Sequence, residues 1–144
     1  MTHPFALQKS RLSPDLARVL AYWKGLRRGE ADMPFWDDAR LTDLPDLSDR
    51  LMLLDVFDKP ERFRFDMVGG ALGANDLPGR FLDETPSAWP LDFLRAEASA
   101  TVECGEPTYY RHDAGDAERV YGRLLLPMWG DGRISMILAV QDLG

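Results

Sequence analysis

The clearest hydrophobic pattern lies near the start of the chain and predicts an amphipathic helix. Its apolar residues recur at helical spacing and form a single stripe, made by Leu12, Leu16, Val19, Leu20, Trp23 and Leu26. Ser13 and Pro14 are residue types favoured at a helix N-terminus, and Gly29 follows a basic last turn. We therefore predict a lead helix over residues 13–28, preceded by a flexible tail over residues 1–12.

Alternation of apolar and polar residues predicts five strands further along the chain. These strands cover residues 51–57, 62–68, 107–112, 117–128 and 133–141. In the second strand, Phe63, Phe65 and Met67 are expected to share one face. Gly130 and Gly132 separate the last two strands and indicate a hairpin turn, because glycine readily adopts positive φ.

The segments between the strands differ in their expected structure. Residues 30–50 and 71–90 are interrupted by proline or glycine and lack periodicity, which predicts extended connections and short turns. A second helix is expected over residues 90–104, ending before Gly105. Helices between two groups of antiparallel strands indicate one α+β domain over residues 13–144, with the helices on one face of the sheet.

The charge of the chain is acidic overall but unevenly distributed. The formal net charge is -7, which argues against binding to nucleic acid, because a phosphate backbone requires a basic surface. Residues 1–30 nevertheless carry six Lys or Arg against two Asp or Glu. In the lead helix these cations flank the apolar stripe on both sides, as expected for the rim of a hydrophobic contact with a partner.

Cysteine usage and hydropathy give a simple expectation for the compartment. Cys104 is the only cysteine, so neither an intramolecular disulfide nor a multi-cysteine metal site can form. The longest apolar runs are too short to cross a bilayer, and no signal peptide is evident at the N-terminus. We therefore expect a cytoplasmic protein that does not enter the membrane.

No group of residues forms a recognisable catalytic or metal-binding motif. His112 lies in a polar loop and Cys104 at a helix C-terminus, where neither haem ligation nor a reactive thiolate is favoured. No Ser/His/Asp arrangement is visible, and the acidic residues around Asp113 lack the spacing of a calcium loop. We predict no catalytic residue, no metal and no cofactor.

Several segments, in register over residues 16–141, resemble those of a PAS domain, in particular the compact bacterial subfamily that often occurs alone. The segments that carry the resemblance are residues 20–27, 63–72, 76–84, 123–128 and 131–133. The resemblance implies a five-stranded antiparallel sheet with helices over one face and a cavity between them. It also implies a sensory or signalling module, usually not a catalyst, that dimerises through the helix preceding the core. Because no output domain follows Gly144, we expect a downstream signalling protein to receive the signal.

Two sets of candidate residues follow from this interpretation. The walls of a small-molecule site would be Phe65, Met67, Trp89, Phe93, Tyr110, Tyr121, Arg123 and Met136, with Arg123 or Tyr110 orienting the ligand. The stripe of the lead helix could pack on its own sheet or on a second copy of the chain. A homodimer or partner contact would use Leu16, Val19, Leu20, Trp23 and Leu26. Two alternatives stay open: a ligand-free interaction adaptor with a fully packed interior, and a small pocket enzyme of the isomerase or hydrolase type that uses tyrosines.

Overall fold

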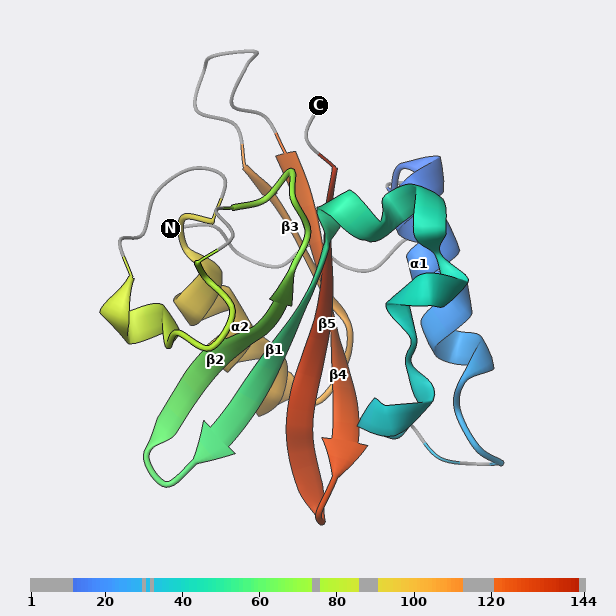
Figure 1. The fold of residues 1–144 in the computed structure, drawn as a ribbon. Coiled ribbons are helices and arrows are strands. Elements are labelled where there is room, and N and C mark those ends of the chain that lie inside the picture. Colours follow the sequence, from blue (N-terminus) through green and yellow to red (C-terminus); the bar gives the residue numbers. More distant parts are fainter. Residues whose placement is uncertain are drawn as a thin grey trace.

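A single sheet of five antiparallel strands forms the centre of the molecule, in a computed structural model that describes residues 12–29, 31, 33–73, 76–85, 91–112 and 121–142 (Figure 1). The strands are β1 (Leu51–Asp58), β2 (Glu61–Val68), β3 (Thr108–His112), β4 (Tyr121–Gly130) and β5 (Arg133–Asp142). Their order is β2-β1-β5-β4-β3, so the last strand in the sequence occupies the central position. The α+β class and the five antiparallel strands predicted from the sequence are confirmed.

In the part of the chain that the structure describes, two α-helices and four short 3-10 helices accompany the sheet. They are α1 (Pro14–Gly25), η2 (Trp36–Asp38), η3 (Leu41–Asp43), η4 (Pro45–Arg50), η5 (Leu82–Glu84) and α2 (Leu94–Cys104). Among the described residues, no helix combines the length and the apolar composition needed to cross a membrane.

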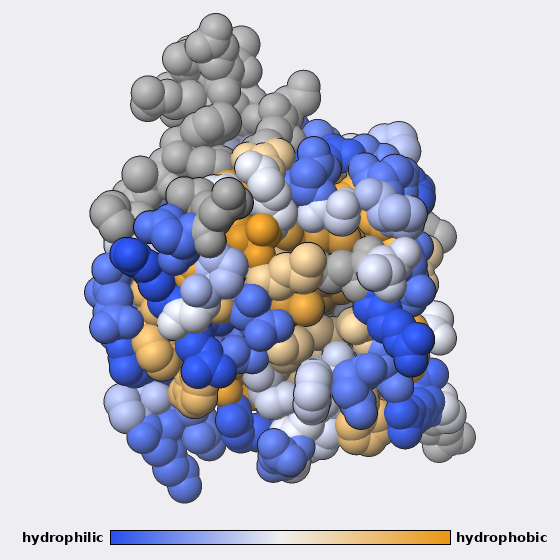
Figure 2. Space-filling model, viewed as in Figure 1, coloured by the Kyte–Doolittle hydropathy of each residue, from blue (hydrophilic) through white to orange (hydrophobic). Residues whose placement is uncertain are grey.

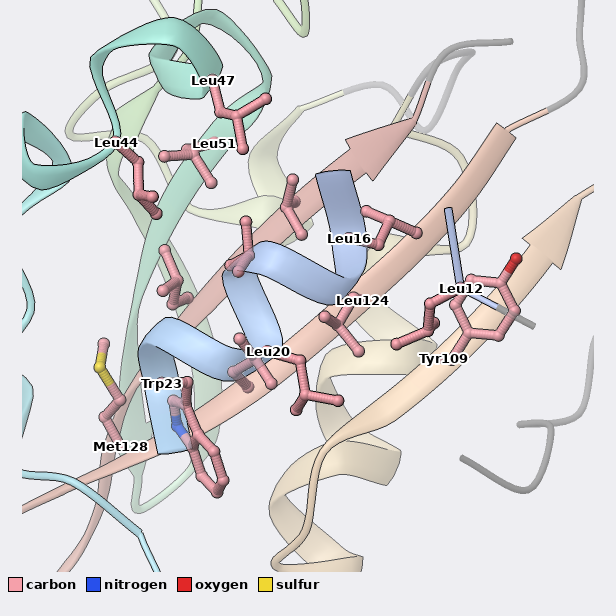
Figure 3. Packing of buried hydrophobic residues seen from close by; sticks show 14 of the residues in the cluster. Leu12, Leu16, Leu20, Trp23, Leu44, Leu47, Leu51, Tyr109, Leu124 and Met128 are labelled. Carbon is pink, nitrogen blue, oxygen red and sulfur yellow. The ribbon is translucent and has the colours of Figure 1, made fainter. Parts of the chain in front are cut away.

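Helix α1 forms as the apolar stripe predicts, but it is shorter. The Ser13 hydroxyl accepts a hydrogen bond of 3.3 Å from the Leu16 amide, which satisfies one of the free N–H groups at the helix start. The helix ends at Gly25, before the predicted residue 28. Its buried side faces β4 and β5, where the Trp23 indole donates a hydrogen bond of 2.9 Å to the Pro127 carbonyl (Figure 3).

Helices cover both faces of the sheet. The helices between the two groups of strands share one face, as predicted, and the lead helix packs on the other face. Helix α1 packs with η4 on one face, whereas α2 and η5 pack on the other. In the space-filling view, apolar residues gather in the middle of the molecule and polar residues surround them (Figure 2). Strand β4 has apolar side chains on both faces, so a helix can pack on each. Leu124 and Leu126 belong to the core beside α1, and Leu125 belongs to the core beside α2. A continuous apolar run such as that of β4 is typical of a strand buried on both faces.

A β-bulge in β2 changes which side chains of this strand reach the core. Leu53 is opposite Met67 and Leu54 is opposite Phe65, so Asp66 is an extra residue without a partner. A bulge of one residue reverses the alternation beyond it. Phe65 is therefore buried, whereas Met67 is 43% exposed. The predicted shared face of Phe63, Phe65 and Met67 is wrong for Met67.

The hairpin between β4 and β5 confirms the glycine-based prediction. Asp131 and Gly132 both have positive φ angles, of 54° and 77°. Two consecutive residues in this region form the tight turn that matches the twist of antiparallel strands. Trp129, close to this turn, remains partly exposed and forms a β-bridge with Phe35, the residue before η2.

Candidate functional site

A row of polar side chains crosses the sheet beneath α2. Tyr110 of β3 is opposite Arg123 of β4, which is opposite Gln141 of β5. The next residues toward the middle of the sheet on this face, Leu125 and Ala139, are apolar and fully buried. This polar row therefore marks the boundary of the core between α2 and the sheet.

The Arg123 guanidinium is the centre of a buried network. It has no exposed surface, and its Nη1 atom lies 2.7 Å from Oε1 of Glu97, a residue of α2 that is only 3% exposed. Its Nε atom donates a hydrogen bond of 2.8 Å to Gln141 Oε1, and Nη1 also donates to the Asp92 carbonyl at 3.1 Å. Arg123 thus connects the start of α2 with the C-terminal end of β5.

Tyr121 extends this network toward the N-terminal end of α2. Its hydroxyl lies 2.8 Å from Oδ1 of Asp92, to which it donates, and 3.4 Å from Arg123 Nη2. The guanidinium carbon of Arg123 lies 5.0 Å from the centre of the Tyr121 ring. Burial raises the pKa of Tyr121, and the positive charge of Arg123 opposes this only in part. The hydroxyl therefore remains protonated and acts as a donor at neutral pH.

Tyr110 places a second hydroxyl at the same face of the sheet. Its oxygen is buried and forms no hydrogen bond of ordinary geometry with a described residue. The Thr108 side chain, which is hydrogen-bonded to Thr101, is the polar group beside it. Burial raises the pKa of Tyr110, and the negative charge of Glu97 adds to this effect. Burying a hydroxyl without a partner is unfavourable, so a water molecule or a ligand that bonds to this group would stabilise it.

The charge of Arg123 is balanced by Glu97, and the Asp92 carboxylate adds a further negative charge at the edge of the network. Glu97 neutralises Arg123, while Gln141 and the Asp92 carbonyl occupy further donors of the guanidinium. The desolvation of a buried ion pair often exceeds the attraction between its charges, so such a pair is no simple source of stability. The side chains of this network thus offer both donors and acceptors, most of which are engaged with one another.

The structure brings together only part of the predicted ligand-binding set. Tyr121 and Arg123 share the network, and Tyr110 and Phe65 belong to the core on the α2 face. Met136 belongs to the opposite core, beside α1, because its side chain leaves β5 on the other face. Trp89 lies outside the described residues.

Two further predicted residues do not face this core. Met67 points to solvent because of the bulge at Asp66, as described above. Phe93 is 49% exposed and directly precedes α2, with a positive φ of 63°. This left-handed conformation turns the chain before the helix begins, so the predicted inward direction of Phe93 is wrong.

The residues predicted for a dimer or partner contact lie mainly in the intramolecular core. Leu16, Val19, Leu20 and Trp23 are buried against β4 and β5 of their own chain, as Figure 3 shows for Leu16, Leu20 and Trp23. Leu26, the residue after α1, is partly exposed. A contact with a second copy through the four buried side chains would require α1 to leave its own sheet.

Sequence reasoning missed Glu97 and Gln141, although both carry a detectable signal. Glu97 lies at helical spacing between Leu94 and Thr101, on the buried side of α2. Gln141 continues the alternation of Ile137 and Ala139 along β5. A polar residue that continues an apolar stripe is a candidate for a buried network, because such a residue requires a partner inside the protein.

A pocket at the opposite end of β4 was not predicted. It has a volume of about 270 Å³ and is lined by Ala31, Met33, Phe35 and Trp129. Within the described ranges, no cluster of three or more His, Cys, Asp or Glu side chains is arranged to hold a metal ion.

Comparison with known proteins does not identify the chain. No protein-family model matches it. No curated protein and no solved structure matches it either. Functional conclusions therefore depend on the chemistry of the sites themselves.

Proposed function

We propose that this chain is a non-catalytic, cytoplasmic sensory module of the PAS type, which binds a polar small molecule beneath α2. The observation that carries the proposal is the polar row of Tyr110, Arg123 and Gln141 across the face that α2 covers. A few convergent polar groups in an otherwise apolar interior are typical of a small-molecule site. The unsatisfied Tyr110 hydroxyl would donate a hydrogen bond to the ligand.

The same network suggests how binding could change the protein. Arg123 connects Glu97 and Asp92, at the start of α2, with Gln141 near the end of β5. A ligand that competes for one of these hydrogen bonds would shift α2 relative to the sheet. Such a population shift requires that the ligand bind the two arrangements with different affinity. The altered surface would then be recognised by a downstream signalling protein.

Native mass spectrometry of the protein purified from its own host tests this proposal. We expect a retained small molecule, and we expect Tyr110→Phe to lose most of it while keeping the far-ultraviolet circular dichroism of the native chain. Phe93→Ala is the matched control, because Phe93 is exposed and should not affect retention. A protein that carries no small molecule, and that no member of a metabolite library stabilises against heat, would contradict the proposal.

The ligand-free adaptor is a second candidate function, supported by a different observation. Leu125, Ile137 and Ala139, in the core beside α2, are completely buried, as in a tightly packed interior. In an adaptor, the unsatisfied Tyr110 hydroxyl would be occupied by an ordered water molecule. An empty protein in the native mass spectrum, together with unchanged partner binding by Tyr110→Phe, would favour this function.

A further inference from the structure

Three exposed aromatic side chains gather at the end of β4. Phe35, Trp36 and Trp129 have exposed fractions of 37%, 46% and 37%. They account for three of the five large apolar side chains that are exposed in the described part of the chain. Together with Met33 they form what we call the aromatic surface, and Met33, Phe35 and Trp129 line the half-open pocket described above.

The aromatic surface is held in place by specific contacts. The Trp129 amide donates a hydrogen bond of 2.8 Å to the Pro34 carbonyl, which joins the two segments. Trp36 packs over Gly130 so closely that any side chain at Gly130 would collide with the indole. The Arg28 guanidinium lies 4.9 Å from the centre of the Phe35 ring and forms a salt bridge of 2.7 Å with Asp38. Exposed apolar groups that are fixed in this way are typical of a surface prepared for contact.

Charges of both signs lie on the elements that flank the aromatic surface. Lys24 and Arg27 belong to the C-terminal end of α1 and the turn after it, whereas Asp37 lies in η2 and Asp131 in the β4–β5 turn. All four residues are exposed, and none of them forms a salt bridge with another described residue. A contact between identical surfaces requires that each surface carry both members of every charge pair.

We propose that a second copy of this chain covers the aromatic surface in a two-fold symmetric dimer. The aromatic side chains of each copy pack against the pocket of the other, and Lys24 and Arg27 of one copy face Asp37 and Asp131 of its partner. Small interfaces of this kind give weak, concentration-dependent association. This inference does not depend on the proposed function, because the aromatic surface lies on η2 and the end of β4, outside the network around Arg123.

Sedimentation velocity over a range of about 10 to 500 µM tests the dimer. We expect a concentration-dependent shift of the wild-type protein from monomer to dimer. Trp129→Ser and Trp36→Ser should remain monomeric over the whole range. Met67→Ser is the matched control, because it removes an exposed apolar side chain on β2 and should leave association unchanged.

A charge exchange tests the arrangement without altering any apolar residue. One variant carries Lys24→Asp and Arg27→Asp, and the other carries Asp37→Lys and Asp131→Lys. Each variant alone should be monomeric, while their mixture should form a heterodimer in 50 mM salt, about as strongly as the wild type. Circular dichroism spectra that match the wild type establish that both variants are folded.

Three outcomes would overturn the inference. A wild-type protein that is monomeric at the highest concentration excludes a self-contact and leaves the surface to a different partner. A dimer that persists in Trp129→Ser and Trp36→Ser places the interface elsewhere. Charge variants that do not associate on mixing contradict the proposed pairing of cations with carboxylates.

Discussion

Glu97 and Arg123 form a salt bridge of 2.7 Å between α2 and β4, although both side chains are buried. Replacing Glu97 by leucine should lower the free energy of unfolding by about 3–5 kcal/mol, because Arg123 keeps its charge and loses its counter-ion. The double variant Glu97→Leu/Arg123→Met should recover most of this loss. Urea denaturation of the two single variants and the double variant measures the coupling.

The exposed ion pair between Arg18 and Asp46 is the matched control for this experiment. Its atoms also lie 2.7 Å apart, but both side chains are largely exposed. We expect Asp46→Asn to have a small effect that disappears at high salt, because water already screens these charges. Equal losses for the single variant at Glu97 and for the double variant would contradict the pairing of Glu97 with Arg123.

The bulge in β2 predicts opposite results for two residues on the same strand. Phe65→Ala should lower the free energy of unfolding by about 3–5 kcal/mol, because it leaves a cavity in the core beside α2. Met67→Ala should change it by no more than about 0.5 kcal/mol, because Met67 is 43% exposed and lies outside both cores. Urea denaturation of both variants compares them. A loss at Met67 comparable to that at Phe65 would mean that the strand is not bulged at Asp66.

The hydrogen bond between Trp23 and Pro127 predicts that removing the indole nitrogen lowers the free energy of unfolding. Trp23→Phe keeps an aromatic ring in the core but leaves the Pro127 carbonyl without its 2.9 Å partner. We expect a loss of about 1–3 kcal/mol, the usual effect of an unsatisfied buried acceptor. Chemical denaturation followed by circular dichroism gives the value. A stability equal to that of the wild type would show that water reaches this carbonyl.

The β4–β5 turn predicts that any side chain at Gly132, its second central position, lowers the stability of the protein. Gly132 has a φ of 77°, which residues with a Cβ adopt only with strain, and open space surrounds the position of a Cβ. Gly132→Ala should therefore destabilise the protein by about 1–2 kcal/mol through backbone strain alone. Gly70→Ala is the control, because Gly70 also has open space but lacks a positive φ. Thermal denaturation of both variants separates the strain at positive φ from the effect of adding a methyl group.

The buried tyrosines predict instability at alkaline pH. Burial raises the pKa of Tyr121 and of Tyr110 above the value of 10.0 for a free tyrosine. Above pH 10.0 the unfolded chain loses these protons while the folded chain retains them, so the free energy of unfolding falls as the pH rises. Below that pH both states are protonated and this contribution to stability is fully present.

Urea denaturation between about pH 8 and pH 11 measures this dependence. The double variant Tyr110→Phe/Tyr121→Phe should show a shallower decrease, because it lacks the two phenols that ionise only on unfolding. The absorbance of ionised tyrosine near 295 nm provides an independent signal. An identical slope in the wild type and the double variant would mean that other groups cause the alkaline loss.

The sequence predicted the elements of this fold well, because each follows from neighbouring residues. The alternation of β2 and the stripe of α1 depend on local spacing, and both elements formed. The bulge at Asp66 depends on the pairing of β2 with β1, which local alternation does not contain. The face of the sheet on which α1 packs similarly depends on β4. Its continuous apolar run places buried side chains on both faces, so helices can pack on either one.

The candidate site was predicted in part for a related reason. Tyr121 and Arg123 directly precede the apolar run of β4, and a polar side chain at such a position indicates a buried hydrogen-bonding group. Glu97 and Gln141 sit at buried positions of their elements, but their role becomes clear only when α2 is placed over β4 and β5. The aromatic surface joins residues nearly one hundred positions apart, and only the fold brings Phe35 next to Trp129.

The central position of β5 has a consequence for how the chain folds during synthesis. Strands β1 and β4 flank β5 and are not paired with each other in the sheet. Until residue 142 leaves the ribosome, the β1–β2 pair and the β3–β4 pair lack β5, the strand that joins them. Contacts between residues so distant in the sequence form slowly, and unpaired strand edges remain exposed in the meantime. The nascent chain therefore completes its sheet only after β5 emerges, and until then the edges of β1 and β4 that β5 covers remain unpaired.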